Sequence, residues 1–424
     1  MMSNDISPKV SVIVPVWNPG PSISRCVESL RSQTLEDIEL IFVDDRGTDG
    51  TMEVVRAAAA EDPRIRIITN AVNVGPGPSR NIGIEVARGE YLSLVDADDH
   101  VNGCFLERLF AKAIAGQLDI VKGRICYVKE DGTQANHPEL NDEIRKGIQL
   151  GKPLFFLFSY EHQSALYRRA FIMDNAVRFG TSRRAEDITF LLKACHKALR
   201  FNLEETAEYC FFERKDSLTH ETSPCTLEKV LHGFQEQMDY IVDNMKNEYY
   251  VPEYVSKRVN HHIKLCNYFG KIQECKESAN RFLIGLREQV FRFPQLEKLK
   301  KESFIVCVLC DYGVALSYQP FKLPWEKHKI ESYVETIQKW VDFVKGHPEC
   351  ANAAEEDLCR LYREAEALCF SENSHLPLSL VRDVKKICQI NNNNMKQTIR
   401  TFIAKIPLVK PLYHVAKQKL NKMD

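Results

Sequence analysis

The chain has 424 residues, and its 57 Lys and Arg nearly balance its 58 Asp and Glu, which leaves a formal net charge of -1. This length suits about two or three domains, and a balanced charge argues against a general nucleic-acid binder, which is usually basic. No apolar run approaches the ~18–20 residues of a membrane span, and residues 1–5 do not resemble a signal peptide. The 14 scattered cysteines are typical of reduced thiols, so we expect a cytoplasmic protein.

The first hundred residues alternate strand and helix patterns. Short aliphatic runs predict strands at residues 10–14, 40–43, 65–68 and 91–95. Three helices are predicted between these strands. The first is indicated by the helical spacing of Ile23, Cys26, Val27 and Leu30. The second is capped by Thr48 or Asp49 and runs to about residue 60, and the third covers residues 79–87. This alternating order predicts an α/β fold, with a mainly parallel sheet and helices on both faces.

The pattern changes after about residue 225. Long, charged segments with helical periodicity follow at residues 226–246, 253–291, 327–344 and 354–369, and strand patterns nearly vanish. We therefore predict three parts: an α/β domain at residues 1–222, an α-helical region at residues 223–390 and a C-terminal tail at residues 391–424.

Polar residues follow three of the four predicted strands. These strand ends read Pro15-Val16-Trp17-Asn18, Asp44-Asp45 and Asp96-Ala97-Asp98-Asp99. One such Asp is often only a turn residue or a helix cap, but ligands of parallel sheets bind beyond the carboxyl ends of the strands, and three such ends share one edge. So many acids would repel one another, and hard carboxylate oxygens suit small divalent cations. The sequence therefore predicts a Mn²⁺ or Mg²⁺ site here.

Over roughly residues 8–220, the chain resembles family-two glycosyltransferases. The matching segments are residues 9–15 with 17–18, 29–34, 43–45 with 48–49, 73–75, 79–83, 87–91 and the Asp-x-Asp element at residues 96–98. The resemblance implies a GT-A type nucleotide-sugar fold, which is Rossmann-like, together with metal dependence and inversion at the anomeric carbon.

The resemblance also implies roles for single residues. The implied nucleotide-sugar site comprises Pro15, Trp17, Asn18, Asp45, Arg80, Asp96 and Arg214, and the metal would be held by Asp98 with Asp96. An aromatic ring offers a stacking face, and an Asp can accept a hydrogen bond from a nucleobase N–H. Alternatives remain open at this point: Trp17 could cap the core, Arg80 and Arg214 could be surface charges, and Asp99 could support the metal or cap a helix.

A second group lies downstream, at residues 183–190, and resembles the family's Glu-Asp element, in which the Asp is the catalytic base. Here that residue is Asp187. Taken alone, Glu186 and Asp187 would be an ordinary acidic helix N-terminus. A base has a clear task, because an acceptor hydroxyl is a poor nucleophile until its proton is removed.

The resemblance implies transfer of a sugar from a nucleotide-diphospho-sugar, most often a UDP-sugar in this family, to a hydroxyl of a glycan or lipid-linked acceptor in surface polysaccharide or lipopolysaccharide assembly. The Gln-x-x-Arg-Trp element of processive synthases is absent from the sequence, so we expect non-processive transfer. The alternative is a catalytically inactive protein that binds nucleotide sugars or acts as a scaffold. The presence of both Asp98 and Asp187 argues against that alternative.

The C-terminal tail is basic. Residues 395–424 contain seven Lys and Arg and one acid, so they carry +6 while the rest of the chain carries -7. Apolar residues lie among the lysines, and Pro407 and Pro411 interrupt any helix. A basic amphipathic segment can bind an anionic membrane, so we predict peripheral contact with the inner face of the plasma membrane. Docking onto the core or onto a partner protein is the alternative.

Deletion of residues 395–424 tests this prediction. The shortened protein is expected to lose its binding to anionic liposomes, because the deletion removes a segment with a net charge of +6 and leaves a chain with a net charge of -7. Co-sedimentation with liposomes measures the effect, and unchanged binding would contradict a membrane role for the tail.

Overall fold

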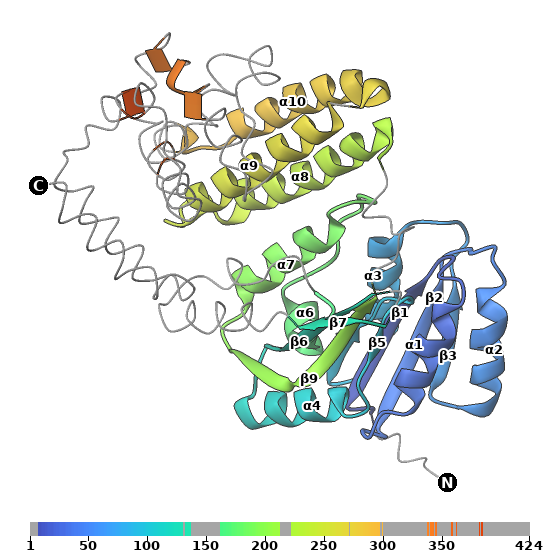
Figure 1. Ribbon diagram of the computed structural model, residues 1–424. Coiled ribbons are helices and arrows are strands. Elements are labelled where there is room, and N and C mark those ends of the chain that lie inside the picture. The colour runs from blue at the N-terminus through green and yellow to red at the C-terminus, as the bar shows by residue number, and fades with distance from the viewer. Residues whose placement is uncertain are drawn as a thin grey trace, which may run out of the picture. The chain divides into compact units, whose positions relative to one another are not determined.

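The computed structural model describes residues 7–129, 132–136, 162–212, 222–270 and 272–296, Leu299, and a few single positions between 337 and 384. The chain divides into two compact units, Met1–Asn244 and Met245–Asp424, which are considered separately (Figure 1). Helix α8 (Pro224–Asn244) belongs to the first unit. The predicted division at residues 222 and 390 stays a prediction, and the basic tail lies outside the described residues.

Four parallel strands form one half of the sheet in the first unit. Strand β1 (Val10–Val16) pairs with β2 (Ile38–Asp44) on one side and with β4 (Tyr91–Leu94) on the other, and β2 pairs with β3 (Ile65–Thr69). Strands β1, β2 and β4 are buried along their whole length, which explains why their sequences are continuous apolar runs and do not alternate. The four predicted strands are therefore confirmed.

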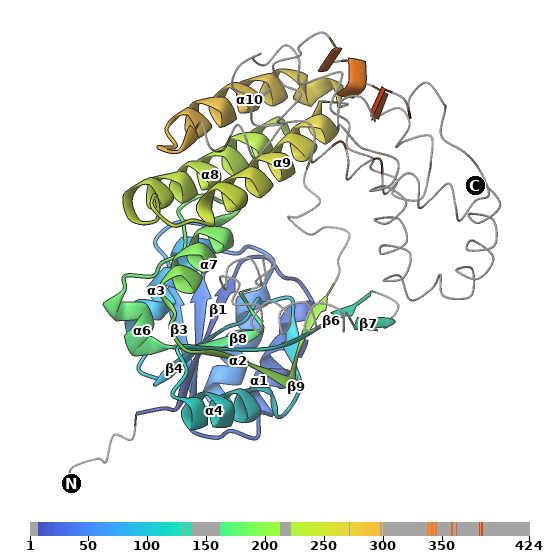
Figure 2. The same ribbon diagram turned by 90° about the vertical axis from the view of Figure 1, so that its left-hand side faces the viewer.

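The other half of the sheet is mixed. It contains β5 (His100–Val101), β6 (Ile120–Val128), β7 (Gln134–Asn136), β8 (Ala165–Arg168) and β9 (Phe201–Phe212). Strand β8 runs antiparallel to both β4 and β6, whereas β6 and β9 are parallel and lie side by side along much of their length (Figure 2). The nine-stranded sheet has the order β3-β2-β1-β4-β8-β6-β9-β5, with β7 paired to β6.

Helices cover both faces of this sheet, as predicted. Helices α1 (Ser22–Arg31), α2 (Thr51–Glu61) and α4 (Phe105–Gly116) bury their apolar residues in one cluster with alternate residues of β1. Helix α3 (Pro76–Val86) lies on the opposite face, where Gly83 packs directly on Ile13. On that face Tyr167 of β8 also meets Phe190 of α7 (Glu186–Lys197), with ring centroids 5.1 Å apart. A short helix, α6 (Arg169–Asp174), follows β8.

Helix α2 begins later than the sequence indicates. Its N-cap is Gly50, which has a positive φ of 77°, and neither Thr48 nor Asp49 occupies that position. The Asp49 carboxylate still accepts a hydrogen bond from the Thr51 amide at 3.1 Å, so it caps the helix from one residue further out. The Thr48 amide instead donates to Asn18 Oδ1, and this hydrogen bond ties the loops after β1 and β2 together.

The described elements of the second unit are helical. Helix α9 (Val251–Phe269) and α10 (Lys276–Phe291) pack on each other and are joined through a 3-10 turn at Gln273–Cys275. His262 of α9 contacts Phe282 of α10 edge-on, with ring centroids 5.8 Å apart. Apolar residues recur at helical spacing on both buried faces, which confirms the helical periodicity of this region.

Close packing at the amino ends of the strands gives a test of the fold. The Gly89 amide donates to Ser11 Oγ at 2.7 Å, and a Cβ at Gly89 would overlap the Ser11 backbone. Replacing Gly89 by Ala is expected to lower the stability by about 1–3 kcal/mol, because the β1 backbone cannot move away cheaply. Thermal or urea unfolding measures this loss. Gly103→Ala is the control, since its Cβ would meet nothing closer than 3.8 Å, and an equal loss there would contradict the explanation.

Candidate functional site

The carboxyl ends of three neighbouring parallel strands form one edge of the sheet. In the pairing of β1 with β2, Val16 is level with Asp44, and β4 ends beside the middle of β1, where Ile13 is level with Leu94. The polar segments that follow these strands therefore lie along a single edge. This is where parallel sheets bind ligands.

Pro15 and Trp17 differ in accessibility at this edge. Pro15 is buried within β1 and pairs with Val43. Trp17 is 47% exposed, so its indole does not cap the core and presents a flat apolar surface to solvent. An exposed aromatic face of this kind can stack on a planar ring.

Asn18 and Asp49 join the loops after β1 and β2. Asn18 has a positive φ of 48°, and its Oδ1 accepts a hydrogen bond from the Thr48 amide at 2.7 Å. Asp49 Oδ2 accepts one from the Gly20 amide at 2.8 Å. The side-chain oxygen of Asn18 thus braces a loop, and its amide nitrogen is the atom left for a ligand.

Asp45 is buried and organises the loop after β3. Its Oδ1 accepts hydrogen bonds from Asn70 Nδ2 and from the Val74 amide, each at 2.8 Å, and its Oδ2 accepts one from the Gly75 amide at 2.8 Å. A carboxylate has about four lone-pair sites. These three donors leave capacity for about one further hydrogen bond, on Oδ2.

Arg80 of α3 links two acidic segments that are far apart in the sequence. Its Nη2 donates to Asp96 Oδ1 at 2.6 Å, and its Nη1 donates to Glu186 Oε1 at 3.2 Å. The guanidinium also lies over the Phe179 ring, 5.0 Å from the centroid. Arg80 is 4% exposed, so it is a buried bridge and not a surface charge.

The environment of Asp96 favours the ionised form. Its Oδ2 accepts a hydrogen bond from Gln163 Nε2 at 2.9 Å, in addition to the contact with Arg80. Burial is the largest single influence on Asp96 and opposes ionisation. The charges of Arg80 and His162 and the hydrogen bonds from Gln163 and Arg80 together outweigh it, and the pKa of Asp96 falls to about 2. Gln163 was not singled out from the sequence, because one Gln in a loop carries no pattern.

Asp99 fastens the acidic loop to β9. The Tyr209 hydroxyl donates to Asp99 Oδ2 at 2.7 Å, and the Phe212 amide donates to Asp99 Oδ1 at 2.8 Å. Burial, followed by the nearby charges of Asp98 and Asp96, raises the pKa of Asp99 well above its ordinary value. The role of Asp99 in the structure is therefore to tie two segments together.

Asp98 is the acid of this loop that is placed best for a cation. Its side chain is partly exposed, and its backbone oxygen accepts a hydrogen bond from Arg25 Nη2 at 3.2 Å. Carboxylate oxygens are the ligands that Mg²⁺ and Mn²⁺ prefer, and a cation would relieve the repulsion that raises the pKa of Asp99. The described residues contain no cluster of three or more His, Cys, Asp or Glu suited to hold a metal by themselves.

Asp187 lies in the first turn of α7. The residue before the helix, Ala185, has a positive φ of 63°, and Asp187 Oδ1 accepts a hydrogen bond from the Ile188 amide at 2.8 Å. Burial and then the charge of Glu186 raise the pKa of Asp187 to about 7, despite the opposing influence of Arg80. A carboxylate with this pKa can take up a proton near neutral pH.

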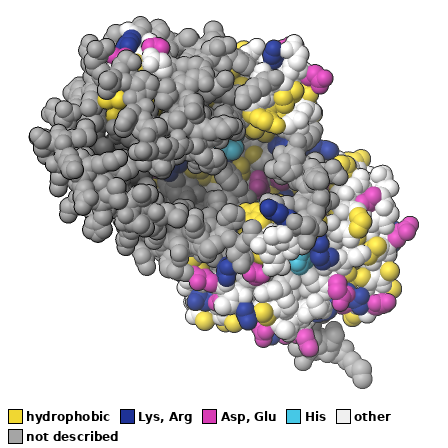
Figure 3. Space-filling view, in the orientation of Figure 1, with side chains coloured by type: hydrophobic (Ala, Val, Ile, Leu, Met, Phe, Trp, Pro, Cys, Tyr) yellow, Lys and Arg dark blue, Asp and Glu magenta, His cyan; other side chains and the backbone are white. Residues whose placement is uncertain are grey.

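The structure thus brings six of the predicted site residues to one sheet edge and places Asp187 across Arg80 from Asp96. Arg214 lies outside the described residues. Acidic and basic side chains are interspersed on the described part of the face in Figure 3.

Comparison with known proteins gives the family. The sequence model described as glycosyl transferase family 2 matches residues 11–175. EpsJ of Bacillus subtilis, described as an uncharacterized glycosyltransferase, is 31% identical over 288 residues, which cover 65% of this chain and 75% of EpsJ. The chain belongs to glycosyltransferase family 2. It is therefore a glycosyltransferase, and the resemblance seen in the sequence is confirmed.

Two further relatives match over smaller shares of their length. YibD of Escherichia coli is 30% identical, with 50% of this chain and 63% of YibD covered. A poly(ribitol-phosphate) beta-glucosyltransferase of Bacillus spizizenii is also 30% identical, with 49% of this chain but only 33% of that protein covered.

A solved structure shows the same fold. TarS of S. aureus (residues 1–349, in complex with UDP-GlcNAc) superposes with a TM-score of 0.60 at 21% identity, over 73% of this chain and 89% of that one. The predicted GT-A type fold of this glycosyltransferase is thereby confirmed.

Among its described helices, none is both long and apolar enough to cross a membrane.

The raised pKa of Asp187 predicts that Asp187→Asn stabilises the glycosyltransferase. An unfolded Asp ionises near 3.8, whereas Asp187 in the folded protein ionises near 7. Folding therefore binds a proton between these values, and the wild type loses stability as the pH rises through them. Because Asn does not titrate, the melting temperature of the variant should exceed that of the wild type by a gap that grows to several degrees between about pH 4 and about pH 8.

Thermal unfolding at a series of pH values measures that gap. Asp174→Asn is the matched control, because Asp174 is exposed on α6. A gap that stays constant with pH for Asp187→Asn would argue against a raised pKa.

Proposed function

We propose that this glycosyltransferase transfers a sugar from a nucleotide-diphospho-sugar to an acceptor hydroxyl in one inverting, metal-dependent step. The observation that carries the proposal is the double contact of Arg80, which bonds Asp96 at the donor edge and Glu186 beside Asp187. A base and a leaving-group site are thereby held in one place. One displacement needs both within reach of the same anomeric carbon.

The donor would bind along the sheet edge. The exposed face of Trp17 suits stacking on the nucleobase, and the remaining capacity of Asp45 Oδ2 suits a ring N–H. The ionised carboxylate of Asp96 is placed to accept hydrogen bonds from the ribose. Pro15 and the amide nitrogen of Asn18 would complete the walls of this site, and Arg80 would shape it through Asp96.

The residues present fit a divalent cation. Asp98 is the main candidate ligand, with Asp96 second, because Arg80 and Gln163 already occupy part of the Asp96 carboxylate. When bound, Mn²⁺ or Mg²⁺ would stabilise the negative charge that develops on the departing diphosphate. Arg214 is proposed to face the same diphosphate.

Asp187 would act as the general base. The acceptor oxygen forms its bond to the anomeric carbon while the bond from that carbon to the diphosphate oxygen breaks, and the acceptor proton passes to the Asp187 carboxylate. With a pKa of about 7, roughly half of this carboxylate is ionised at neutral pH and ready to accept a proton. A single displacement without a covalent sugar–enzyme intermediate would invert the configuration at the anomeric carbon.

The names of the relatives support a polymer acceptor, and the complex of TarS supports a UDP-sugar donor; a lipid-linked acceptor is proposed from the family resemblance alone. TarS has been solved with UDP-GlcNAc, and two relatives are named as a poly(ribitol-phosphate) beta-glucosyltransferase and as the succinoglycan biosynthesis protein ExoO of Rhizobium meliloti, which is 32% identical over 224 residues. We therefore propose non-processive transfer in the assembly of a surface polysaccharide, on the cytoplasmic side.

A donor screen followed by a transfer assay tests the proposal. Thermal shifts with a panel of nucleotide sugars and Mn²⁺ identify the donor, because ligand binding stabilises the folded protein. In a labelled-sugar transfer assay with that donor, Asp187→Asn is expected to lower kcat by about 10²–10⁴-fold and to leave donor affinity nearly unchanged, because only the base is lost.

Asp174→Asn controls for the loss of one acid elsewhere on the unit and should keep full activity. Donor binding without transfer or hydrolysis in the wild type, with every acceptor tried, would favour an inactive binding protein. Full activity of Asp187→Asn would remove the base assignment.

A further inference from the structure

The segment at residues 180–185, here called the base loop, leads directly into α7 and sets the position of Asp187. Its first amide, on Gly180, donates to the Glu186 backbone oxygen at 3.2 Å, so the loop folds back on the start of the helix. Its last residue, Ala185, is held at a positive φ of 63°. Non-glycine residues adopt this conformation rarely, so surrounding contacts must hold it in place.

Helix α3 supports the base loop from one side. A Cβ at Gly77 would lie 2.6 Å from the Gly180 oxygen and 2.8 Å from Glu186 Cγ. The loop therefore rests on the α3 backbone at a position where no side chain fits. Arg80, one helical turn further along α3, reaches Glu186 from the same side.

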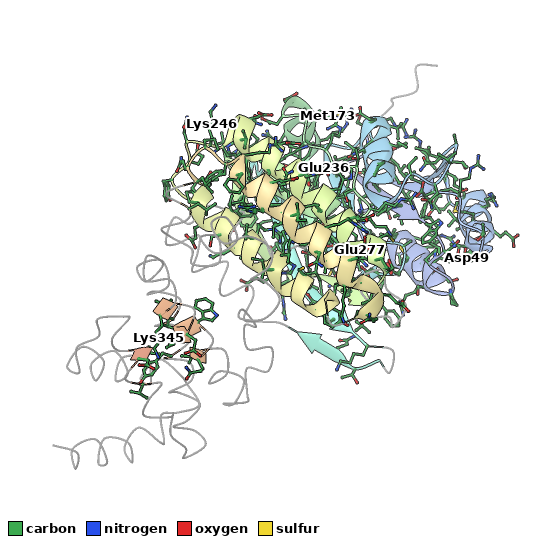
Figure 4. All side chains as sticks on the ribbon, turned by 90° about the horizontal axis from the view of Figure 1, so that it is seen from above. Asp49, Met173, Glu236, Lys246, Glu277 and Lys345 are labelled. Atoms are coloured by element: carbon green, nitrogen blue, oxygen red, sulfur yellow. The ribbon has the colours of Figure 1, made fainter. Side chains whose placement is uncertain are left out.

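Helix α8 holds the base loop from a second direction, and Glu236 is its main contact. Glu236 is labelled in Figure 4. Its Oε1 accepts hydrogen bonds from both the amide and the hydroxyl of Thr181, each at 2.7 Å. Ser182 Oγ donates to the Lys229 backbone oxygen at 2.6 Å. A Cβ at Gly233 would lie 2.6 Å from the Arg184 oxygen, so this helix too touches the loop backbone.

The two oxygens of Glu236 differ in their contacts, and its charge also attracts Lys193 of α7. Oε2 is buried beside Gly180 and has no hydrogen-bond partner among the described residues. Leaving a buried carboxylate oxygen unpaired is unfavourable. The gain from placing Glu236 here is the fixed position of Thr181.

From these contacts we propose that Glu236 is a positioning residue for the transfer reaction. By fixing Thr181, it holds the base loop against α3 and so keeps Asp187 at the place and in the partly buried environment that its role requires. The proposal rests on the proposed function of Asp187 as the base. It adds α8, which lies beyond the residues 11–175 matched by the family model, to the machinery of the site.

Glu236→Ala and Glu236→Gln test this role in the full-length protein. Loss of the Thr181 contacts lets the base loop shift, and a misplacement of about 1 Å can cost about a hundredfold in rate. We expect kcat to fall about a hundredfold for Glu236→Ala and less for Glu236→Gln, which keeps an acceptor oxygen. The donor KM should stay within about twofold, because the donor edge of the sheet is untouched.

The pH profile separates positioning from a general loss of structure. If water reaches Asp187 when the base loop loosens, its pKa falls, and the acidic limb of kcat/KM moves to lower pH by about one unit. A purely structural role would lower the melting temperature and the amount of active enzyme but would leave the limb in place. Asp243→Asn, an exposed acid at the end of the same helix, is the control and should change neither.

Thr181 provides a second pair of variants in case Glu236→Ala does not fold. Thr181→Val removes only the hydroxyl contact and should give a smaller change in the same direction, whereas Thr181→Ser keeps both contacts and should behave as the wild type. Unchanged kcat and an unmoved limb in folded Glu236 and Thr181→Val variants, with Asp187→Asn inactive, would overturn the positioning role alone. If Asp187→Asn is active, the base assignment itself fails, and the two failures are thus distinguishable.

Discussion

The buried guanidinium of Arg80 is the interaction on which the geometry of the site depends. It comes from α3, and its two carboxylate partners follow β4 and begin α7, so one side chain joins three elements. Removing one member of a buried ion pair typically costs about 3–5 kcal/mol, because the remaining charge is left without a partner. The Phe179 ring lies against the guanidinium, with its centroid 5.0 Å from the guanidinium carbon. Arg80 therefore couples the donor edge to the start of α7.

Asp96 and Asp187 both lie near Arg80, but their pKa values differ because their surroundings differ. Asp96 accepts directly from Arg80, and its pKa falls to about 2, so it stays ionised whenever the enzyme is folded. Asp187 has Glu186 as its neighbour and feels Arg80 less, and its pKa rises to about 7. When the environments of two acids push their pKa values apart, commonly one acid stays ionised and the other transfers the proton. Here the difference arises because Asp96 combines the charge of Arg80 with hydrogen bonds from Arg80 and Gln163, whereas burial and the charge of Glu186 dominate at Asp187.

The sequence predicts the parts of this site that depend on local pattern. Continuous apolar runs give the strands of the parallel half, and the acids directly after them give the donor edge, because parallel strands carry their ends to one place. The partners of Arg80 could not be read in this way, since Glu186 is 106 positions further along the chain and ordinary helix periodicity does not specify contacts across the sheet. Gln163, Tyr209 and Glu236 were missed for the same reason. Each acts through long-range hydrogen bonds of its side chain, and no spacing rule marks such a residue.

The two halves of the site are braced by different kinds of contact. The donor edge is held by loops that bond one another, through Asn18 to Thr48 and through Asp45 to the backbone of Val74 and Gly75. The base loop makes few such contacts within itself and depends on two helices that face it with glycines, at Gly77 and Gly233. Donor geometry is therefore a property of the sheet and its adjoining loops, whereas the position of the base follows α3 and α8. Arg80 connects the two through Asp96 and Glu186, and Arg183 of the base loop adds a hydrogen bond to the Asn73 oxygen at 3.0 Å. Because α8 contacts the base loop and these donor-side residues come from other elements, we expect changes in α8 to act first on the base.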